Sequence, residues 1–169
     1  MKIRPATESD VPGILSIINF EIENSTAIYD YEPRTMEMQL AWFRNKQSEK
    51  MPVVVAEDVG NVLGFATYGI FRPKEAYRHS VEHSIYLDPV HRGRGVGSQL
   101  MYHLIEIARA SGCHIMIAGV DASNQASYHF HRKLGFIEVA HFKQIGFKFD
   151  RWLDLIFMQL FMDEKYEKG

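Results

Sequence analysis

The chain has 169 residues, a length that suits one domain. Its formal net charge is −2 at pH 7, which excludes an overall positive potential that would attract nucleic acid or anionic membranes. Hydrophobic residues make up 46% of it, enough to bury a sizeable core. The single cysteine, Cys113, cannot form an internal disulfide, which favours a reducing, cytoplasmic location. We expect no membrane span and no signal segment. One domain is expected over residues 1–162, followed by a charged tail over 163–169.

The first half of the chain predicts a strand, two helices and a hairpin. A short strand is expected over residues 2–5, and Ser9 or Asp10 can cap the helix that follows, whose isoleucines recur at helical spacing. Residues 24–31 break this rhythm and predict a loop. A second helix should begin near Thr35 and end before Pro52. Its apolar face is predicted to hold Met36, Leu40 and Phe43. Strands at 53–57 and 63–71, joined by the turn 58–61, predict the hairpin.

The second half alternates strands and helices. Strands are predicted over residues 81–87, 114–120, 136–142 and 152–161. Helices are predicted over 95–111 and 126–134, closed by Gly112 and Gly135. Along the strand at 81–87, Glu82, Ser84 and Tyr86 alternate with residues that point to the other face. The element order predicts an α/β fold (an α+β mixed sheet). Its central twisted sheet is mostly antiparallel, is flanked by helices, and has a parallel section around the long helix.

The segment between the strand at 81–87 and the long helix is the most informative part of the chain. Residues 92–98, the glycine corner, contain Arg92, Gly93, Arg94, Gly95 and Gly97. Glycines let the backbone turn and let a ligand approach, and the N–H groups of a first helical turn favour a phosphate group. The spacing fits neither the G-x-G-x-x-G dinucleotide fingerprint nor the P-loop. By itself it is as compatible with an ordinary glycine-rich loop as with a pyrophosphate cradle.

The spacing Arg92-x-x-Gly95-x-Gly97 resembles the R/Q-x-x-G-x-G/A signature of the GNAT superfamily of N-acetyltransferases. The element order, Asn124-x-x-Ser127 and the following Lys133-Leu134-Gly135-Phe136 extend the resemblance over nearly the whole chain. Three blocks, residues 81–87, 131–136 and 146–154, resemble the phosphinothricin (methionine sulfoximine) N-acetyltransferase branch. The resemblance implies the acyl-CoA N-acyltransferase fold. It also implies transfer of an acetyl group from acetyl-CoA to the primary amine of a small amino-acid-like acceptor, without a metal.

Glu82 is the candidate general base. An amine attacks a thioester only as the free base, so the site needs a proton acceptor. The resemblance places Glu82 in this role, directly or through a water, on the strand that precedes the glycine corner. Burial would have to raise the pKa of Glu82 for work near neutral pH. The alternative is a solvated or salt-bridged strand residue. His83 points to the opposite face and is expected to be a core residue or to support the site indirectly.

The resemblance also implies which residues contact acetyl-CoA. A backbone N–H of Tyr86 or Leu87 would hold the developing oxyanion. Arg92 and Arg94 would add charge to a pyrophosphate site that backbone amides shape. Asn124 and Ser127 would bind the pantetheine arm, although Asn124 can equally cap the helix that it precedes. The full set of expected cofactor contacts is Ile85, Tyr86, Leu87, Arg92, Gly93, Arg94, Gly95, Val96, Gly97, Ser98, Asn124, Ser127 and His131.

At His131 the chain departs from the wider superfamily. Many members have a tyrosine four residues before the glycine that ends the helix, where it acts as general acid toward the thiolate. His131 could protonate the thiolate as an imidazolium, or it could contact the cofactor with no proton role. Tyr128 lies nearby but one helical turn early.

The sequence defines the acceptor side less sharply. Arg72 is the candidate clamp for a substrate carboxylate, because arginine binds carboxylates in a two-pronged way. A solvated loop arginine is the alternative. Tyr77 belongs to the same segment. Phe20 and Tyr29 come from the first helix and the loop after it, and the core is the favoured alternative for both. With Glu82, these residues form the expected substrate site.

Two other functions stay open at this point. One is acetylation of protein N-termini or other amines, and the other is sensing of acyl-CoA without turnover. The presence of both Glu82 and the glycine corner counts against a sensor. No basic run with interleaved aromatics occurs, so nucleic acid is not an expected partner. The bulky block at 148–153 and the branch resemblance imply a homodimer.

Overall fold

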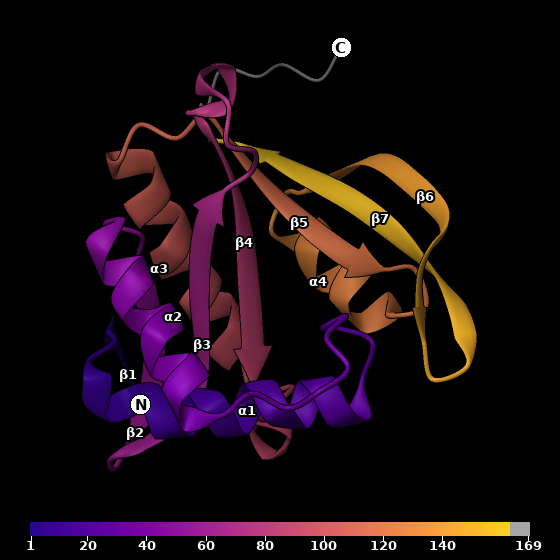
Figure 1. The fold of residues 1–169 in the computed structure, drawn as a ribbon. Coiled ribbons are helices and arrows are strands. Elements are labelled where there is room, and N and C mark those ends of the chain that lie inside the picture. The colour runs from indigo at the N-terminus through magenta and orange to yellow at the C-terminus, as the bar shows by residue number, and fades with distance from the viewer. Residues whose placement is uncertain (163–169) are drawn as a thin grey trace. The chain divides into compact units, whose positions relative to one another are not determined.

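The computed structural model describes residues 1–162, and the charged tail expected at 163–169 lies outside the described residues. The elements follow the order expected from the sequence (Figure 1). The strands are β1 (Lys2–Pro5), β2 (Val53–Asp58), β3 (Asn61–Ile70), β4 (Ser80–Leu87), β5 (Ile115–Asp121), β6 (Ile137–Lys148) and β7 (Arg151–Phe161). The α-helices are α1 (Val11–Asn24), α2 (Met36–Ser48), α3 (Val96–Ala110) and α4 (Gln125–Lys133). Short 3-10 turns are η1 (Glu8–Asp10), η2 (Glu75–Tyr77) and η3 (Pro89–His91).

The seven strands join in the order β1-β2-β3-β4-β5-β7-β6. The pairs β1–β2, β2–β3, β5–β7 and β6–β7 are antiparallel, whereas β4 and β5 run parallel. This confirms the predicted mixed α/β fold with a parallel section around the long helix. The chain divides into two compact units, which are described separately. Among the described residues, the first unit comprises 1–68 and 84–106, and the second comprises 69–83 and 107–162.

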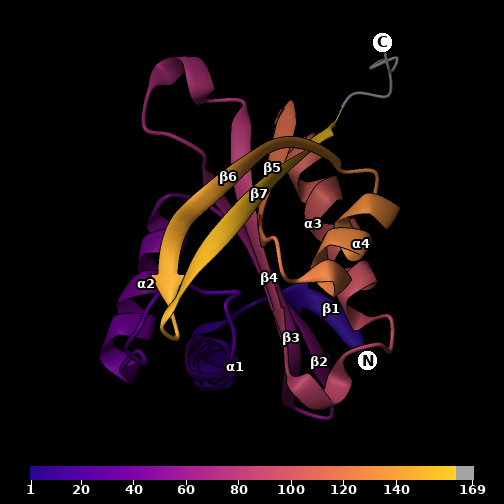
Figure 2. The same cartoon turned by 90° about the vertical axis from the view of Figure 1, so that its right-hand side faces the viewer.

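In the first unit, α1 and α2 lie on one face of the strands and α3 lies on the other (Figures 1 and 2). Phe65 is fully buried, and the centroid of its ring lies 6.2 Å from that of Trp42. On the other face, a Cβ added at Gly64 would lie 2.3 Å from a methyl carbon of Leu87. Only glycine therefore allows this close approach.

The predicted apolar face of α2 was wrong at its first residue. The buried residues of α2 are Gln39 and Phe43, and Leu40 packs against the core. Met36 is 41% exposed. Met36 is the first helical residue after Thr35, whose side chain accepts from Met38 N, so it lies one turn before the part of α2 that meets the core.

In the second unit, β6 and β7 form a long two-stranded ribbon (Figure 2). The prediction that β6 ends at 142 was too short, because the strand resumes after an irregularity between Phe142 and Gly146. Asp154 on β7 supports this irregularity by accepting hydrogen bonds from Gln144 N at 2.8 Å and Lys143 Nζ at 3.0 Å. No helix among the described residues is long and apolar enough to cross a membrane.

Candidate active site

The glycine corner lies in the first unit, where η3 leads into α3. Gly93 and Gly95 have φ values of +72° and +79°, a region that strongly favours glycine. A Cβ added at either position would meet nothing within 4 Å. The two glycines therefore face open space immediately before the first turn of α3. This is the arrangement that a phosphate cradle at a helix N-terminus requires.

The two arginines of the corner have different surroundings. Arg92 forms an ion pair with Glu21, a buried carboxylate of α1. The same guanidinium lies 5.9 Å from the ring centroid of Phe20, and Ser25 Oγ donates to the other oxygen of Glu21 at 2.5 Å. Arg94 is exposed and forms no ion pair with any residue that the structure describes. Arg92 thus ties the corner to α1, whereas the charge of Arg94 is uncommitted.

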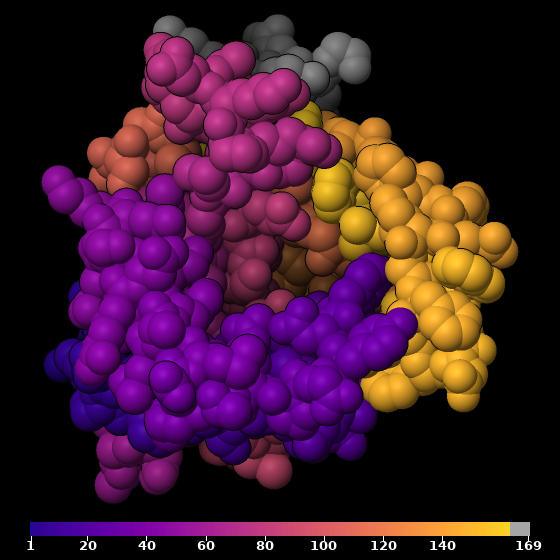
Figure 3. Space-filling view, in the orientation of Figure 1, coloured from indigo at the N-terminus to yellow at the C-terminus, as the bar shows by residue number. Residues whose placement is uncertain are grey.

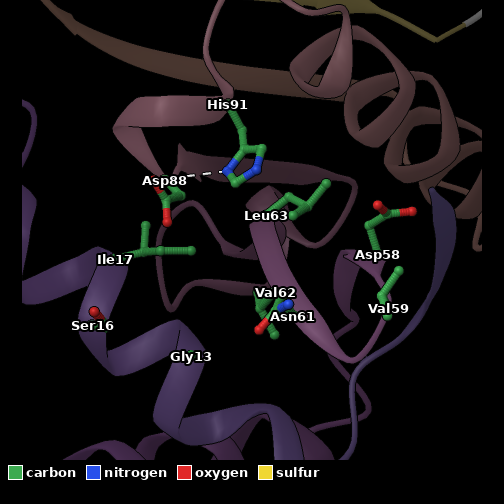
Figure 4. Close-up of a pocket in the computed structure, with 10 residues that line it drawn as sticks. All are labelled: Gly13, Ser16, Ile17, Asp58, Val59, Asn61, Val62, Leu63, Asp88 and His91. Atoms are coloured by element: carbon green, nitrogen blue, oxygen red, sulfur yellow. Dashed lines mark ion pairs between the residues drawn. The ribbon is translucent and has the colours of Figure 1, made fainter.

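A cavity of about 430 Å³ lies in the first unit between α1, the β2–β3 turn and η3 (Figure 4). Asp88 and His91 face one another at its edge, with Asp88 Oδ1 3.8 Å from His91 Nδ1. The cavity is lined by Gly13, Ser16, Ile17, Asp58, Val59, Asn61, Val62, Leu63, Asp88 and His91. No candidate residue named from the sequence lines it.

A second cavity in the first unit, about 120 Å³, reaches the side chain of Tyr86. Its lining residues are Ile18, Ile28, Arg34, Trp42, Lys46, Phe65, Thr67, Ser84 and Tyr86. Sequence reasoning singled out only Tyr86 for the site. The available signal for the others was the pair Trp42 and Lys46, which lie four residues apart and so share one face of α2.

The remaining candidates of the first unit differ in exposure. Phe20 is 39% exposed and Tyr29 is partly buried, so Phe20 does not belong to the core. Tyr86 packs its ring 5.7 Å from that of Phe65, and burial raises the pKa of Tyr86 to about 12. Ile85 and Leu87, which flank Tyr86 on β4, are also partly buried.

In the second unit, Glu82 is a partly buried carboxylate near Arg72. Burial raises the pKa of Glu82, and the positive charge of Arg72 opposes that rise. A Cβ added at Gly119 would lie 3.4 Å from Glu82 Oε1, an ordinary van der Waals contact, so the carboxylate lies beside Gly119 of β5. Arg72 and Tyr77 both contact Phe71, with Arg72 Cζ 5.1 Å from the ring centroid and the Tyr77 ring at 5.8 Å. The structure therefore brings Glu82, Arg72 and Tyr77 into one neighbourhood.

The other candidates of the second unit surround α4. Asn124 caps this helix, because its Oδ1 accepts from Ser127 N at 3.0 Å. His131 is buried, with Nδ1 at 2.7 Å from the carbonyl oxygen of Ser127 and Nε2 at 3.1 Å from Nε2 of His83. Both ring nitrogens of His131 are thus engaged. His83 is buried, as its place on the opposite face of β4 predicted.

The pairing of β4 with β5 is short. Its register runs from Ser80 opposite Ile115 to Glu82 opposite Ile117. Within the described residues, no group of three or more His, Cys, Asp or Glu side chains is placed to hold a metal ion.

Residues 17–136 match the acetyltransferase (GNAT) family, and the chain belongs to that family. It is 47% identical over 162 residues to the L-methionine sulfoximine/L-methionine sulfone acetyltransferase of Pseudomonas aeruginosa, covering 95% of this chain and 94% of that protein. It is 42% identical over 167 residues to the L-amino acid N-acyltransferase MnaT of Escherichia coli (strain K12), covering 99% and 97%.

A solved structure gives the same grouping. The GNAT superfamily phosphinothricin acetyltransferase from Sinorhizobium meliloti, in complex with AcCoA, matches with a TM-score of 0.93 at 36% identity. The match covers 99% of this chain and 91% of that one. Together these comparisons confirm the superfamily and the branch that the sequence motifs indicated.

Proposed function

We propose that this protein transfers the acetyl group of acetyl-CoA to the primary amine of a small amino-acid-like acceptor, such as methionine sulfoximine or phosphinothricin. Family membership and the substrates in the names of its relatives support the reaction class. The observation that carries the proposal is Glu82, a partly buried carboxylate with a raised pKa next to Arg72. A base with a raised pKa is what removal of a proton from an ammonium group requires.

The glycine corner is the proposed pyrophosphate site. Gly93 and Gly95 open the space before α3, and backbone N–H groups over residues 95–98 would meet the phosphates. Arg94 supplies the uncommitted charge. Asn124 and Ser127 are proposed to contact the pantetheine arm in addition to capping α4. Acetyl-CoA supplies the thioester whose carbonyl carbon accepts the amine.

In the proposed reaction, Glu82 takes the proton of the acceptor, directly or through a water. The free amine then forms a C–N bond to the carbonyl carbon as the C–S bond breaks. A backbone N–H of Tyr86 or Leu87 stabilises the negative charge that develops on the carbonyl oxygen. After the C–N bond forms, the nitrogen loses its surplus proton and the departing thiolate gains one. His131 can supply the thiolate only as an imidazolium, which requires that its contact with His83 opens and that its Nε2 is protonated.

Arg72 is the proposed clamp for the carboxylate of the acceptor. It is exposed, and its guanidinium is held over the Phe71 ring rather than in an ion pair among the described residues. Tyr77 is proposed to contact the acceptor beside it, and Phe20 and Tyr29 to contact it from α1 and the following loop. Arginine and aromatic side chains together suit a zwitterion with a partly apolar side chain.

We further propose a homodimer that works in the cytoplasm, where a lone cysteine is expected to stay reduced. The β6–β7 hairpin, orange and yellow in Figure 3, exposes large apolar side chains, among them Phe149 and Trp152, the latter 61% exposed. Exposed apolar clusters of this kind favour association. Light scattering is expected to give a dimer mass for the native protein and a monomer mass for Trp152→Glu. A native monomer would contradict the dimer.

An acceptor screen tests the proposed function. Thiol release from acetyl-CoA is measured with L-methionine sulfoximine, phosphinothricin, free amino acids, polyamines and short peptides. We expect the highest kcat/KM for the amino-acid-like acceptors. A preference for peptides would favour N-terminal acetylation instead, and binding of acetyl-CoA without any thiol release would favour a sensor.

A further inference from the structure

The smaller cavity of the first unit, hereafter the Arg34–Lys46 pocket, is lined by positive charge. Both side chains line it, together with Trp42, Ser84 and Tyr86. Its volume is about 120 Å³. Since roughly 10–15 Å³ suffices for one water, the pocket has room for a group of several non-hydrogen atoms.

The position of Arg34 is fixed by buried or partly buried amide side chains. Asn19 on α1 accepts from Arg34 N at 2.8 Å and donates to Arg34 O at 2.9 Å. Arg34 Nη1 donates to Oε1 of the fully buried Gln39 at 3.4 Å. The counter-ion of Arg34 is Asp30, an exposed carboxylate at 3.0 Å, and exposed ion pairs contribute little. The guanidinium is therefore held at the pocket by Gln39 and Asp30, and a bound anion would compete with the exposed Asp30 carboxylate for it.

Lys46 brings a second cation from α2. Its Nζ donates to the carbonyl oxygen of Tyr68 at 2.8 Å and lies 6.0 Å from the ring centroid of Trp42. An ammonium group has three donors, so two remain for a ligand or water. Burial lowers the pKa of Lys46, and the charge of Glu49 opposes that shift. A bound group with negative or partial negative charge would relieve this desolvation cost.

The polar groups around the pocket are predominantly donors. Ser84 and Tyr86 add hydroxyls from β4; the Ser84 hydroxyl is hydrogen-bonded to that of Tyr86, whose own O–H can still donate. No carboxylate belongs to the lining among the described residues. Thr67 also lines it, but its hydroxyl already donates to Pro52 O at 2.7 Å. A cationic, donor-rich cavity is complementary to a group that carries several acceptor oxygens.

We propose that the Arg34–Lys46 pocket binds an oxygen-bearing group at the end of the acceptor's side chain, and that Arg34 and Lys46 determine specificity for it. Sulfone, phosphinate and carboxylate groups share the required chemistry. The inference rests on the proposed function, because it takes the acceptor to be a small amine. It adds the two residues that select the side chain of the acceptor.

The kinetic test compares L-methionine sulfone with L-methionine, which lacks the sulfone oxygens, and with L-glutamate, which ends in a carboxylate. We expect the native enzyme to prefer the sulfone over methionine by about tenfold or more in kcat/KM. Lys46→Met and Arg34→Gln should each reduce that preference about tenfold while kcat/KM for methionine changes less than about twofold. A preference for glutamate over the sulfone would assign the pocket to carboxylates.

Arg44→Gln is the matched control, because Arg44 is an exposed cation of the same helix and pairs with Glu8. It should leave the preference unchanged. The assignment of the pocket would be overturned if both pocket variants kept the native preference for the sulfone over methionine. It would also be overturned if kcat/KM fell equally for the sulfone and for methionine. Neither result would overturn the proposed function. Thermal unfolding checks that each variant folds. If Arg34→Gln fails to fold, the result for Lys46→Met alone tests the assignment of the pocket.

A binding measurement is independent of turnover. Trp42 lines the pocket, and the chain has one other tryptophan, Trp152, on the β6–β7 hairpin. In a Trp152→Phe background, L-methionine sulfone is expected to change Trp42 fluorescence saturably in the presence of coenzyme A. The change should disappear when Lys46→Met is added. Absence of thiol release with every acceptor would overturn the proposed function, whereas a saturable change that persists with Lys46→Met would overturn the pocket.

Discussion

The Nε2 atoms of His83 and His131 lie 3.1 Å apart, and both imidazoles are buried. His131 Nδ1 is 2.7 Å from the carbonyl oxygen of Ser127, which can only accept, so this nitrogen carries a proton. In the neutral ring, His131 Nε2 is then an acceptor, and His83 Nε2 donates to it. The contacts therefore assign one tautomer to each ring and link β4 to α4 through a pair of neutral histidines.

This pair makes stability dependent on pH. Burial lowers the pKa of both rings, and for His83 the neighbouring His131 lowers it further. In the unfolded chain the pKa of histidine is about 6.5, so below this pH the unfolded chain binds protons at these two rings that the folded protein does not bind. The free energy of unfolding should therefore fall as pH decreases below about 6.5, by up to ~1.4 kcal/mol per pH unit for each histidine.

Urea unfolding at pH 7, 6 and 5 measures this slope. His83→Gln should reduce the slope, because the variant lacks one of the two groups that bind a proton only in the unfolded chain. His129→Gln, an exposed histidine on α4, should leave the slope unchanged. Identical slopes for the native protein and His83→Gln would show that the pair does not govern the pH dependence.

Glu82→Gln is expected to lower kcat by about 10² or more and to leave the affinity for coenzyme A nearly unchanged, because the variant removes only the proton acceptor. In the native enzyme, kcat should rise with pH through the pKa of Glu82, which burial has raised above 4.5. Undiminished turnover by Glu82→Gln would exclude Glu82 as the base.

The rising limb of that pH profile should also report Arg72. The cation favours the ionised carboxylate, so Arg72→Gln should raise the pKa of Glu82 and move the limb to higher pH. Lys74→Gln removes an exposed charge from the same segment and is the control. A limb that moves equally in both variants would mean that loss of net charge, rather than the Arg72 contact, sets the shift.

Local sequence signals predicted most of the fold. The start of the second helix near Thr35, the hairpin turn at 58–61 and the glycine turn of the corner are each specified by residues within a few positions of one another. The extent of β6 could not be predicted in this way, because the irregularity near Gln144 depends on Asp154, ten positions away on β7. Patterns of hydrophobicity do not record such a contact.

The same limit applies to the site. Glu82 and the glycine corner were found because they lie within one short segment that resembles a family motif. The partner of Arg92 was missed because Glu21 lies 71 positions away. The Arg34–Lys46 pocket was missed because its lining comes from α1, the following loop, α2, β3 and β4, and no sequence motif joins them.

Gly95 offers a test of the corner with an internal control. Both Gly95 and Gly60 have strongly positive φ values, +79° and +82°, and both face open space. Alanine at either position should therefore cost a similar ~1–2 kcal/mol of stability. Gly95→Trp should in addition abolish coenzyme A binding in calorimetry, because the indole would fill the cradle, whereas Gly60→Trp should not. Tight binding by folded Gly95→Trp would refute the placement of the cradle.

Alanine substitutions at Arg92 and Arg94 should have different effects: the first should lower the stability of the protein, and the second should weaken its affinity for coenzyme A. Arg92→Ala leaves the buried Glu21 carboxylate without its ion-pair partner. We expect a loss of about 1–2 kcal/mol in the free energy of unfolding, a reduced figure because Arg92 itself is half exposed. Arg94→Ala should change stability by less than about 0.5 kcal/mol, because its side chain is exposed. It should weaken coenzyme A binding several-fold, and raised salt should reduce that difference.

Glu21→Gln completes the comparison. If Arg92 acts through Glu21, the double variant Glu21→Gln/Arg92→Ala should be more stable than the sum of the two single losses predicts, because the uncompensated carboxylate is gone. Urea unfolding gives the coupling energy, and calorimetry gives the affinity of each variant for coenzyme A. Additive stabilities, together with an affinity loss in Arg92→Ala as large as that in Arg94→Ala, would instead make Arg92 a direct pyrophosphate ligand. The ion pair with Glu21 would then have to open when the cofactor binds.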